Sequence, residues 1–215
     1  MNDPVIFINA LQNSLSEHAD QDSALKLFIE ALQDISPVFT DCVTDDLNHP
    51  LMTQLDGALN SALGPPELVE SVAALSSTGG WYQVYTGGGI NADMADFMLA
   101  KQIVGPKGLI PSDSTRAGIF LLAPNFDYLM HDHAAMEVYY VHSGSIDIQN
   151  GTESKPRRLV PGEYSITPSE IPHALHTGDE PVLLLYVWTG NISAPIWWWL
   201  KGEDGIWTRT LAKEP

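Results

Sequence analysis

The first third of the chain carries hydrophobic residues at the three- and four-residue spacing of an amphipathic helix. The clearest set follows Asp22-Ser23, a suitable helix N-cap, and consists of Leu25, Phe28, Ile29 and Leu32. A second helix is predicted after Asp45-Asp46, with its hydrophobic face formed by Leu51, Leu55 and Leu59, and it ends before Gly64-Pro65-Pro66. A short third helix is predicted over residues 67–75. Residues 1–78 are therefore predicted to form an N-terminal α-helical extension.

The pattern changes at Ser76-Ser77-Thr78-Gly79-Gly80, whose small residues suit a linker. Beyond it, short apolar runs alternate with turn signals such as Ser143-Gly144 and Asn150-Gly151, and the second of these suits a tight hairpin. Strands are predicted over residues 81–85, 97–104, 117–123, 137–142, 145–149, 164–167 and 182–188. This many strands without a helical crossover predict an antiparallel sandwich or jelly roll. Residues 79–215 are the predicted β domain.

Composition narrows the function classes. The 215 residues carry 27 Asp+Glu against 10 Lys+Arg, a formal charge of −17, which argues against nucleic acid and anionic membranes as partners. The single cysteine, Cys42, excludes an intrachain disulfide. The apolar stretch at residues 5–11 lacks a preceding basic region, and no stretch approaches the ~20 apolar residues of a membrane span. We expect a cytoplasmic protein that acts on a small molecule, and a homodimer is left open.

Four polar residues have the spacing of a metal site. His131 and His133 lie one residue apart, so on a strand both side chains point to the same face, and Glu137 keeps that parity. His173, from a neighbouring strand, would complete a set of three imidazoles and one carboxylate. Such a set binds one divalent ion, for which Zn²⁺, Fe²⁺, Mn²⁺ and Ni²⁺ all qualify. This constellation is typical of an enzyme.

The same residues carry a resemblance to the cupin family. His131, His133, Glu137 and Gly144 fall on the spacing of the first cupin motif, G-x5-H-x-H-x(3–4)-E-x6-G. The second motif, G-x5-P-x-G-x2-H-x3-N, is matched by Gly162, Pro168 and His173. Three positions depart from these motifs and carry Asn125, Glu170 and Thr177 in place of Gly, Gly and Asn. The resemblance covers residues 115–190 and implies a single cupin barrel, a mainly β fold, behind the helical extension.

A narrower resemblance is to the cupin-type dimethylsulfoniopropionate (DMSP) lyases. It is carried by Tyr139, two residues beyond Glu137, by Tyr128 three before His131, and by Trp188 in the segment Y-x-W-x-G. The resemblance implies a carbon–sulfur lyase that cleaves DMSP to dimethyl sulfide and acrylate by β-elimination. It further implies Tyr139 as the base that removes the proton. Aromatic rings attract a sulfonium through cation–π contacts, and Tyr128 and Trp188 are the candidates for these contacts by their position.

The chemistry of a tyrosine base requires a nearby cation. A free phenol, with a pKa of about 10, is a poor base at neutral pH, and a bound metal favours the phenolate. Tyr139 shares the face of Glu137 and is therefore expected to point at the metal. The other histidines are not expected to be ligands, because His142 has the opposite parity and His176 is predicted to lie beyond its strand. The run Trp197-Trp198-Trp199 is interpreted as a cover for the barrel or a dimer contact.

Three other functions fit parts of the pattern. A cupin dioxygenase uses the same ligands but requires a redox-active metal and consumes O₂. A sugar-phosphate isomerase is disfavoured because no cluster of Lys and Arg accompanies the ligands. A non-catalytic small-molecule sensor would need a DNA-binding or signalling partner, and the acidic N-terminal third has no basic recognition helix.

Overall fold

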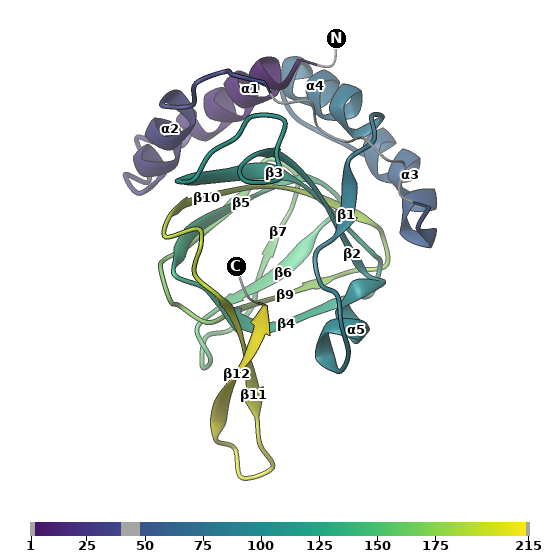
Figure 1. The fold of residues 1–215 in the computed structure, drawn as a ribbon, viewed down its shortest axis with the longest axis vertical. Coiled ribbons are helices and arrows are strands. Elements are labelled where there is room, and N and C mark those ends of the chain that lie inside the picture. The colour runs from purple at the N-terminus through teal and green to yellow at the C-terminus, as the bar shows by residue number, and fades with distance from the viewer. Residues whose placement is uncertain (1–2, 40–47, 214–215) are drawn as a thin grey trace.

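The computed structural model describes residues 3–39 and 48–213, and it contains two facing antiparallel sheets with a layer of helices over one of them (Figure 1). Both sheets have six strands, and the hydrophobic core lies between the sheets and beneath the helices. The mainly β cupin-type fold with N-terminal helices is confirmed. Asp45-Asp46 and Cys42 lie outside the described residues. Within the described part of the chain, no helix is long and apolar enough to span a membrane.

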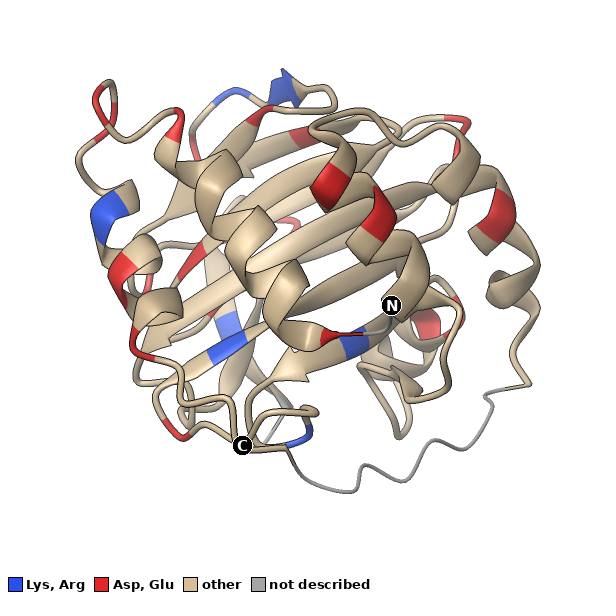
Figure 2. Ribbon diagram, turned by 90° about the horizontal axis from the view of Figure 1, so that it is seen from above, with Lys and Arg blue, Asp and Glu red and all other residues tan. Residues whose placement is uncertain are grey.

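The helices form where the sequence supplies caps and an apolar face. Helix α1 (Pro4–Ser16) begins at Asp3, whose carboxylate accepts a hydrogen bond from the backbone nitrogen of Val5 at 2.9 Å. Helices α2 (Leu25–Gln33) and α4 (Pro66–Ser76) flank it and bury leucines, while their glutamates, Glu30, Glu67 and Glu70, are exposed. Figure 2 marks the acidic positions along the helices in red. Between them, the predicted second helix is a 3-10 turn, η1 (Pro50–Gln54), followed by α3 (Leu55–Asn60). A further short helix, α5 (Ile90–Ala95), was not predicted.

The first sheet has the strand order β1-β2-β3-β10-β5-β8 and lies under the helices. Its strands are β1 (Trp81–Gln83), β2 (Met98–Val104), β3 (Thr115–Leu122), β10 (Val182–Gly190), β5 (Ala135–Ser143) and β8 (Tyr164–Thr167). All six correspond to predicted strands, with ends that differ by up to two residues. Strands β3, β10 and β5 are almost wholly buried because the helices cover their outer face and the second sheet covers the inner face.

The second sheet has the strand order β12-β11-β4-β9-β6-β7. Its strands are β12 (Trp207–Lys213), β11 (Ile196–Lys201), β4 (Asp127–Asp132), β9 (His173–Thr177), β6 (Ile146–Asn150) and β7 (Arg157–Leu159). Only β6 was assigned from the sequence. Six residues, 151–156, separate β6 from β7, so the tight hairpin predicted at Asn150-Gly151 is wrong. Strands β11 and β12 form a hairpin that extends away from the barrel (Figure 1).

Two of the three departures from the cupin motifs lie at turns, and the third, Thr177, is the last residue of β9. Asn125 and Glu170 replace motif glycines, and both adopt positive φ angles, 52° and 60°, so the backbone conformation that favours glycine is kept at these positions. Thr177 replaces the motif asparagine. Its hydroxyl donates to the carbonyl of Ala123 at 2.7 Å and accepts from the backbone nitrogen of Phe126 at 2.9 Å. The two hydrogen bonds of Thr177 hold the start of β4 against β9. Both strands carry histidines of the candidate site.

Candidate metal centre

Three buried histidines meet inside the barrel. His131 lies on β4, His133 follows it in the turn to β5, and His173 opens β9 opposite His131. One ligand-capable atom from each of the three lies within 4.8 Å of the others. The tertiary fold thus brings together three of the four predicted metal ligands, from two motifs about 40 residues apart in the sequence.

Each of these imidazoles is held in the tautomer that a metal requires. The Nδ1 atoms lie close to backbone carbonyls: His131 to Leu129 at 2.7 Å, His133 to Ala135 at 3.0 Å and His173 to Ile171 at 3.0 Å. A carbonyl oxygen only accepts, so each Nδ1 carries the proton and each Nε2 keeps a free lone pair. The Nε2 of His173 is buried without a hydrogen-bond partner. An unpartnered buried nitrogen with a free lone pair fits a metal ligand.

Glu137, on β5, completes the group. Its Oε2 lies 3.1 Å from Nε2 of His133 and 3.3 Å from Nε2 of His173. Two ligands of one ion, each about 2.1 Å from it, stand roughly 3.0–3.4 Å apart, so these separations fit a shared cation. Burial raises the pKa of the Glu137 carboxyl, but the neighbouring imidazoles of His133 and His173 outweigh burial and lower the pKa to about 2.

The electrostatics of the group suit metal ligation. Burial, reinforced by the charges of His173 and His133, holds the pKa of His131 well below its usual value of 6.5. At neutral pH His131 is therefore uncharged and Glu137 is ionised. Metal ligands must be in these protonation states, so the site requires no proton loss from either residue before an ion binds.

Tyr139 lies two residues beyond Glu137 on β5 and is fully buried. Its ring centroid is 6.4 Å from that of His173, and its hydroxyl forms a hydrogen bond with Glu137. Burial and the negative charge of Glu137 raise the pKa of the Tyr139 phenol well above 10. Tyr139 therefore lies in the same interior as His173 and Glu137, and its phenol is neutral unless a cation stabilises the phenolate.

Tyr128 lies on β4 and faces the same interior. Its ring stacks on His131 with centroids 4.2 Å apart, and its hydroxyl is 2.5 Å from the hydroxyl of Tyr85. Tyr85 follows β1 in a loop, and its ring lies 4.9 Å from that of Trp198 on β11. Trp198 in turn meets His131 edge-on at 5.9 Å. Tyr85, Tyr128 and Trp198 form an aromatic wall on one side of the histidines.

Trp188, on β10, lies on the other side. Its indole Nε1 donates to Oε1 of Glu137 at 2.5 Å, and its ring stacks on His133 with centroids 3.9 Å apart. Its backbone pairs with Glu137 on β5 and with Arg116 on β3. The side chain therefore contacts two of the predicted ligands directly and limits the orientations that Glu137 and His133 can adopt.

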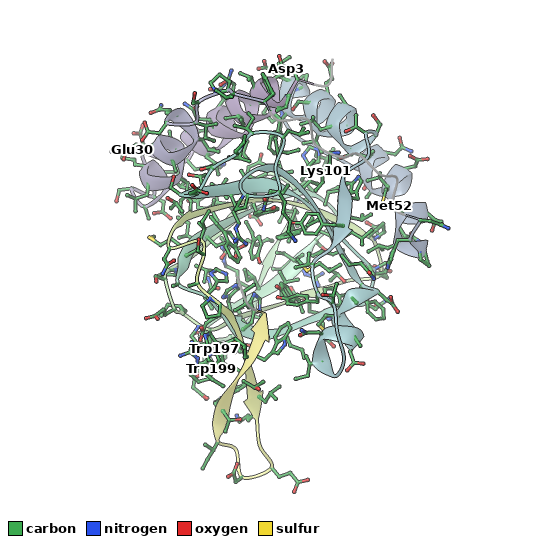
Figure 3. The ribbon with its side chains drawn as sticks, viewed as in Figure 1. Asp3, Glu30, Met52, Lys101, Trp197 and Trp199 are labelled. Atoms are coloured by element: carbon green, nitrogen blue, oxygen red, sulfur yellow. The ribbon has the colours of Figure 1, made fainter. Side chains whose placement is uncertain are left out.

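The C-terminal hairpin is fastened to the strand that carries His131. Asp132 is buried, and its two carboxylate oxygens accept from Arg209 on β12, at 2.6 Å, and from the indole nitrogen of Trp199 on β11. The Arg209 guanidinium also lies over the rings of Trp197, at 5.0 Å, and Trp199, at 5.7 Å. Figure 3 labels both tryptophans on the hairpin where it meets the barrel. We call these four residues the Asp132 cluster.

The family profile of dimethylsulfoniopropionate lyases matches residues 31–184. The chain belongs to the DMSP lyase family. A curated family member, the DMSP lyase DddQ of Ruegeria pomeroyi, is 31% identical over 136 residues, which are 62% of this chain and 67% of that protein. Members of this family are carbon–sulfur lyases, and so is this protein.

Solved structures of DMSP lyases share the fold. The crystal structure of DddQ from Ruegeria pomeroyi superposes with a TM-score of 0.68 at 25% identity, covering 89% of this chain and 94% of that one. A chain from the crystal structures of the DMSP lyases RdDddP and RnDddQII gives a TM-score of 0.63 at 21% identity, covering 88% and 97%. The second comparison supports the fold alone. Trp188 and the C-terminal hairpin lie beyond the residues that the family profile matches.

Two aromatic residues of the site escaped sequence reasoning. Tyr85 stands in a Gly-rich loop with no periodic signal. Trp198 was assigned with its neighbours to a barrel cover or dimer contact, and for Trp198 this is wrong, because it pairs with His131 and points inward. The alternation of Trp197, Trp198 and Trp199 across the strand was the available signal.

The remaining histidines near the motifs are not in the ligand group. His142 is buried with neither ring nitrogen hydrogen-bonded, and its backbone oxygen accepts from Leu63. His176 was predicted beyond its strand, and this is wrong: β9 extends to Thr177, and Nδ1 of His176 lies 2.7 Å from Asp127. Its side chain pairs with an exposed carboxylate outside the group of three histidines.

Proposed function

We propose that this protein is a metal-dependent DMSP lyase that cleaves DMSP to dimethyl sulfide and acrylate by β-elimination. The observation that carries the proposal is a set of three buried imidazoles whose Nδ1 atoms are tied to carbonyls, in a chain of the DMSP lyase family. The Nε2 atoms of His133 and His173 are directed at Glu137. His131, His133, Glu137 and His173 are the proposed ligands of one divalent ion. Zn²⁺, Fe²⁺, Mn²⁺ and Ni²⁺ all suit such ligands, and availability selects among them.

When bound, the divalent ion would act as a Lewis acid toward the substrate carboxylate and would favour the phenolate of a nearby tyrosine. Tyr139 is the proposed base. Its oxygen takes the proton from the carbon alpha to the carboxylate, and the electron pair left behind forms the carbon–carbon double bond of acrylate. The bond from the beta carbon to sulfur breaks, its electrons go to sulfur, and neutral dimethyl sulfide leaves. The raised pKa of Tyr139 in the surroundings of Glu137 is the reason that a cation is required.

The sulfonium of DMSP needs a surface that tolerates positive charge and offers no nucleophile. Aromatic rings do so through cation–π attraction of roughly 0.5–2 kcal/mol. Tyr128 and Trp188 are the proposed substrate contacts. The Arg116 guanidinium lies 5.5 Å from the Trp188 ring centroid and repels a second cation. We therefore assign the sulfonium to the Tyr128 side, with Tyr85 and Trp198 around it, and the carboxylate to the Trp188 side.

The helices of residues 1–78 are proposed to act as a scaffold for the barrel domain, residues 79–215, and to carry no catalytic group. Helices α2 and α3 pack against β10, the strand that bears Trp188. A cytoplasmic location, the absence of nucleic-acid and membrane partners, and a homodimeric state stay predictions.

The test is headspace detection of dimethyl sulfide after purified, metal-loaded protein is mixed with DMSP. We expect dimethyl sulfide and acrylate in equal amounts, with and without oxygen, and none from protein that has been stripped with a chelator. A product that forms only when O₂ is consumed would assign the protein to the cupin dioxygenases instead. Folded, metal-loaded protein that releases no dimethyl sulfide would refute the proposed substrate.

A further inference from the structure

Arg116 lies two strands away from Glu137 in the same sheet, with Trp188 between them. On β3 it pairs with Trp188 of β10, and Trp188 pairs with Glu137 of β5. Side chains of cross-strand partners lie on the same face of a sheet. Because the indole of Trp188 reaches Glu137 inside the barrel, the Arg116 side chain starts on that inner face too, and its guanidinium lies over the Trp188 ring.

Among the described residues, Arg116 has no anionic or carbonyl partner, unlike the other three arginines. The chain has four arginines, all at described positions, and the other three donate hydrogen bonds: Arg157 to Tyr164, Arg158 to Asp147 and Arg209 to Asp132. The Nε of Arg116 is buried without a hydrogen-bond partner, and the described residues form no ion pair with its guanidinium. A buried donor left unpaired costs free energy, so an acceptor from outside the chain would relieve that cost.

A second cation lies close by. The Lys107 ammonium is 5.0 Å from the ring centroid of Tyr82, and burial raises the pKa of Tyr82 while the charge of Arg116 lowers it. Tyr82 is thus near both cations. Lys107 is exposed, and its backbone nitrogen donates to the side chain of Gln102 at 2.7 Å, which fixes the turn that carries it. In a chain of net charge −17, two cations without carboxylate partners among the described residues mark a local positive site.

We propose that Arg116, with Lys107 beside it, is a recognition site for the carboxylate group of a small aliphatic acid. The proposal rests on the proposed function, because it concerns the carboxylate end of the same substrate. A guanidinium offers paired N–H donors that match a carboxylate, and such charge-assisted bonds are stronger than neutral ones. The positive charge beside Trp188 also orients a substrate that carries both signs of charge, since its sulfonium is repelled toward Tyr128.

The experiment compares Arg116→Gln and Arg116→Lys with a matched control, Arg157→Gln, whose arginine donates to a backbone carbonyl at the surface. Propionate is the probe: its affinity for metal-loaded protein is measured by calorimetry, with propionamide as the uncharged analogue of similar shape. We expect Arg116→Gln to weaken propionate binding by about 10- to 100-fold and to leave propionamide binding unchanged. Arg116→Lys should recover part of the loss, and Arg157→Gln should bind as the unaltered protein does.

Kinetics with DMSP separate recognition from catalysis. For Arg116→Gln we expect KM to rise with kcat changed by less than about 3-fold, and the effect of added salt on kcat/KM to weaken. Propionate affinity within 2-fold of the unaltered protein overturns the proposal. So does a lower Tm in Arg116→Gln with unchanged propionate affinity, because a purely structural role would give that result.

The same measurements distinguish failure of this inference from failure of the proposed function. If the protein releases no dimethyl sulfide but propionate binding still depends on Arg116, the carboxylate site stands and the substrate assignment falls. If dimethyl sulfide is released and the Arg116 variants match the unaltered protein in KM and propionate affinity, the substrate assignment stands and the carboxylate site falls.

Discussion

Arg209→Ala should destabilise the protein and loosen the candidate metal centre, although Arg209 contacts none of the proposed ligands. Arg209 bonds Asp132, which stands between His131 and His133 in the sequence and is buried. Without the guanidinium, the Asp132 carboxylate keeps the indole of Trp199 as a hydrogen-bond partner and loses its ion-pair partner. The end of β4 is then held less firmly to the hairpin. His131 lies at this end of β4 and His133 directly follows it, so both histidines are affected.

The magnitude follows from the contacts of the Asp132 cluster. A hydrogen bond to a charged group contributes about 1.5–3 kcal/mol, and each of the two cation–π contacts about 0.5–1 kcal/mol. The Arg209 side chain is 41% exposed, so water replaces part of what is lost, and we expect a net loss of about 2 kcal/mol. For a chain of this length the corresponding fall in Tm is about 4–8 °C.

The matched control is Arg158→Ala. Arg158 also forms a two-point contact with an aspartate, Asp147, at 2.9 and 2.8 Å, but that pair is exposed and remote from the ligands. Exposed pairs contribute little to stability, so its Tm should stay within about 2 °C of the unaltered protein. Thermal unfolding followed by circular dichroism measures both variants, and elemental analysis after dialysis against a chelator measures retained metal.

The comparison has a decisive outcome. We expect Arg209→Ala to lose metal faster than Arg158→Ala at equal protein concentration. Equal Tm values for the two variants, or a stability loss in Arg209→Ala with metal retention unchanged, would contradict the argument that the hairpin supports the ligand strand.

Three further predictions concern single side chains. Tyr139→Phe should lower turnover of DMSP by about 10²- to 10⁴-fold, because only the hydroxyl of the proposed base is removed. The metal content should stay unchanged, since the ring and the proposed ligands remain. Near-normal activity would move the base to Tyr128. The double variant His133→Ala/His173→Ala should bind no stoichiometric metal by elemental analysis, and an ion that persisted would defeat the ligand assignment. Burial lowers the pKa of His142 to about 4, against about 6.5 in the unfolded chain, so the unfolded state takes up a proton first and stability falls as pH drops from 6.5 toward 4. Between pH 6.5 and pH 5 the contribution of His142 to the free energy of unfolding should fall by about 1.5 kcal/mol. The variant His142→Leu should lack this part of the fall, which urea titrations at both pH values measure.

The candidate metal centre could be located from the sequence because three of its residues are close together in the chain. His131, His133 and Glu137 lie on two strands, β4 and β5, and in the turn between them, and not on one strand as the parity argument assumed. The short turn brings them to the same interior. The helical periodicity before residue 76 is local in the same sense, since each helix buries a stripe defined by its own spacing. The family resemblance added His173, whose distance along the chain varies with the intervening loops.

Other parts of the site depend on strand pairing that no local pattern encodes. Tyr128 lies three residues before His131, and on a regular strand the two side chains would point to opposite faces. A register shift in the pairing of β4 with β9 falls between Tyr128 and His131, and their rings stack. The sequence marked Tyr128 as a candidate, but only the irregular pairing explains how it shares the interior with His131.

The most distant contributions were decided by the tertiary structure alone. Tyr85 and Trp198 reach the histidines from a loop and from the C-terminal hairpin, and Arg116 reaches Trp188 through the pairing of β3 with β10. Residue type and spacing along the chain determined the candidate metal-binding set and the fold class. The surroundings of that set, namely its aromatic wall, the Asp132 cluster and the unpaired arginine, arise from which strands lie side by side, because those contacts join residues that are tens of positions apart.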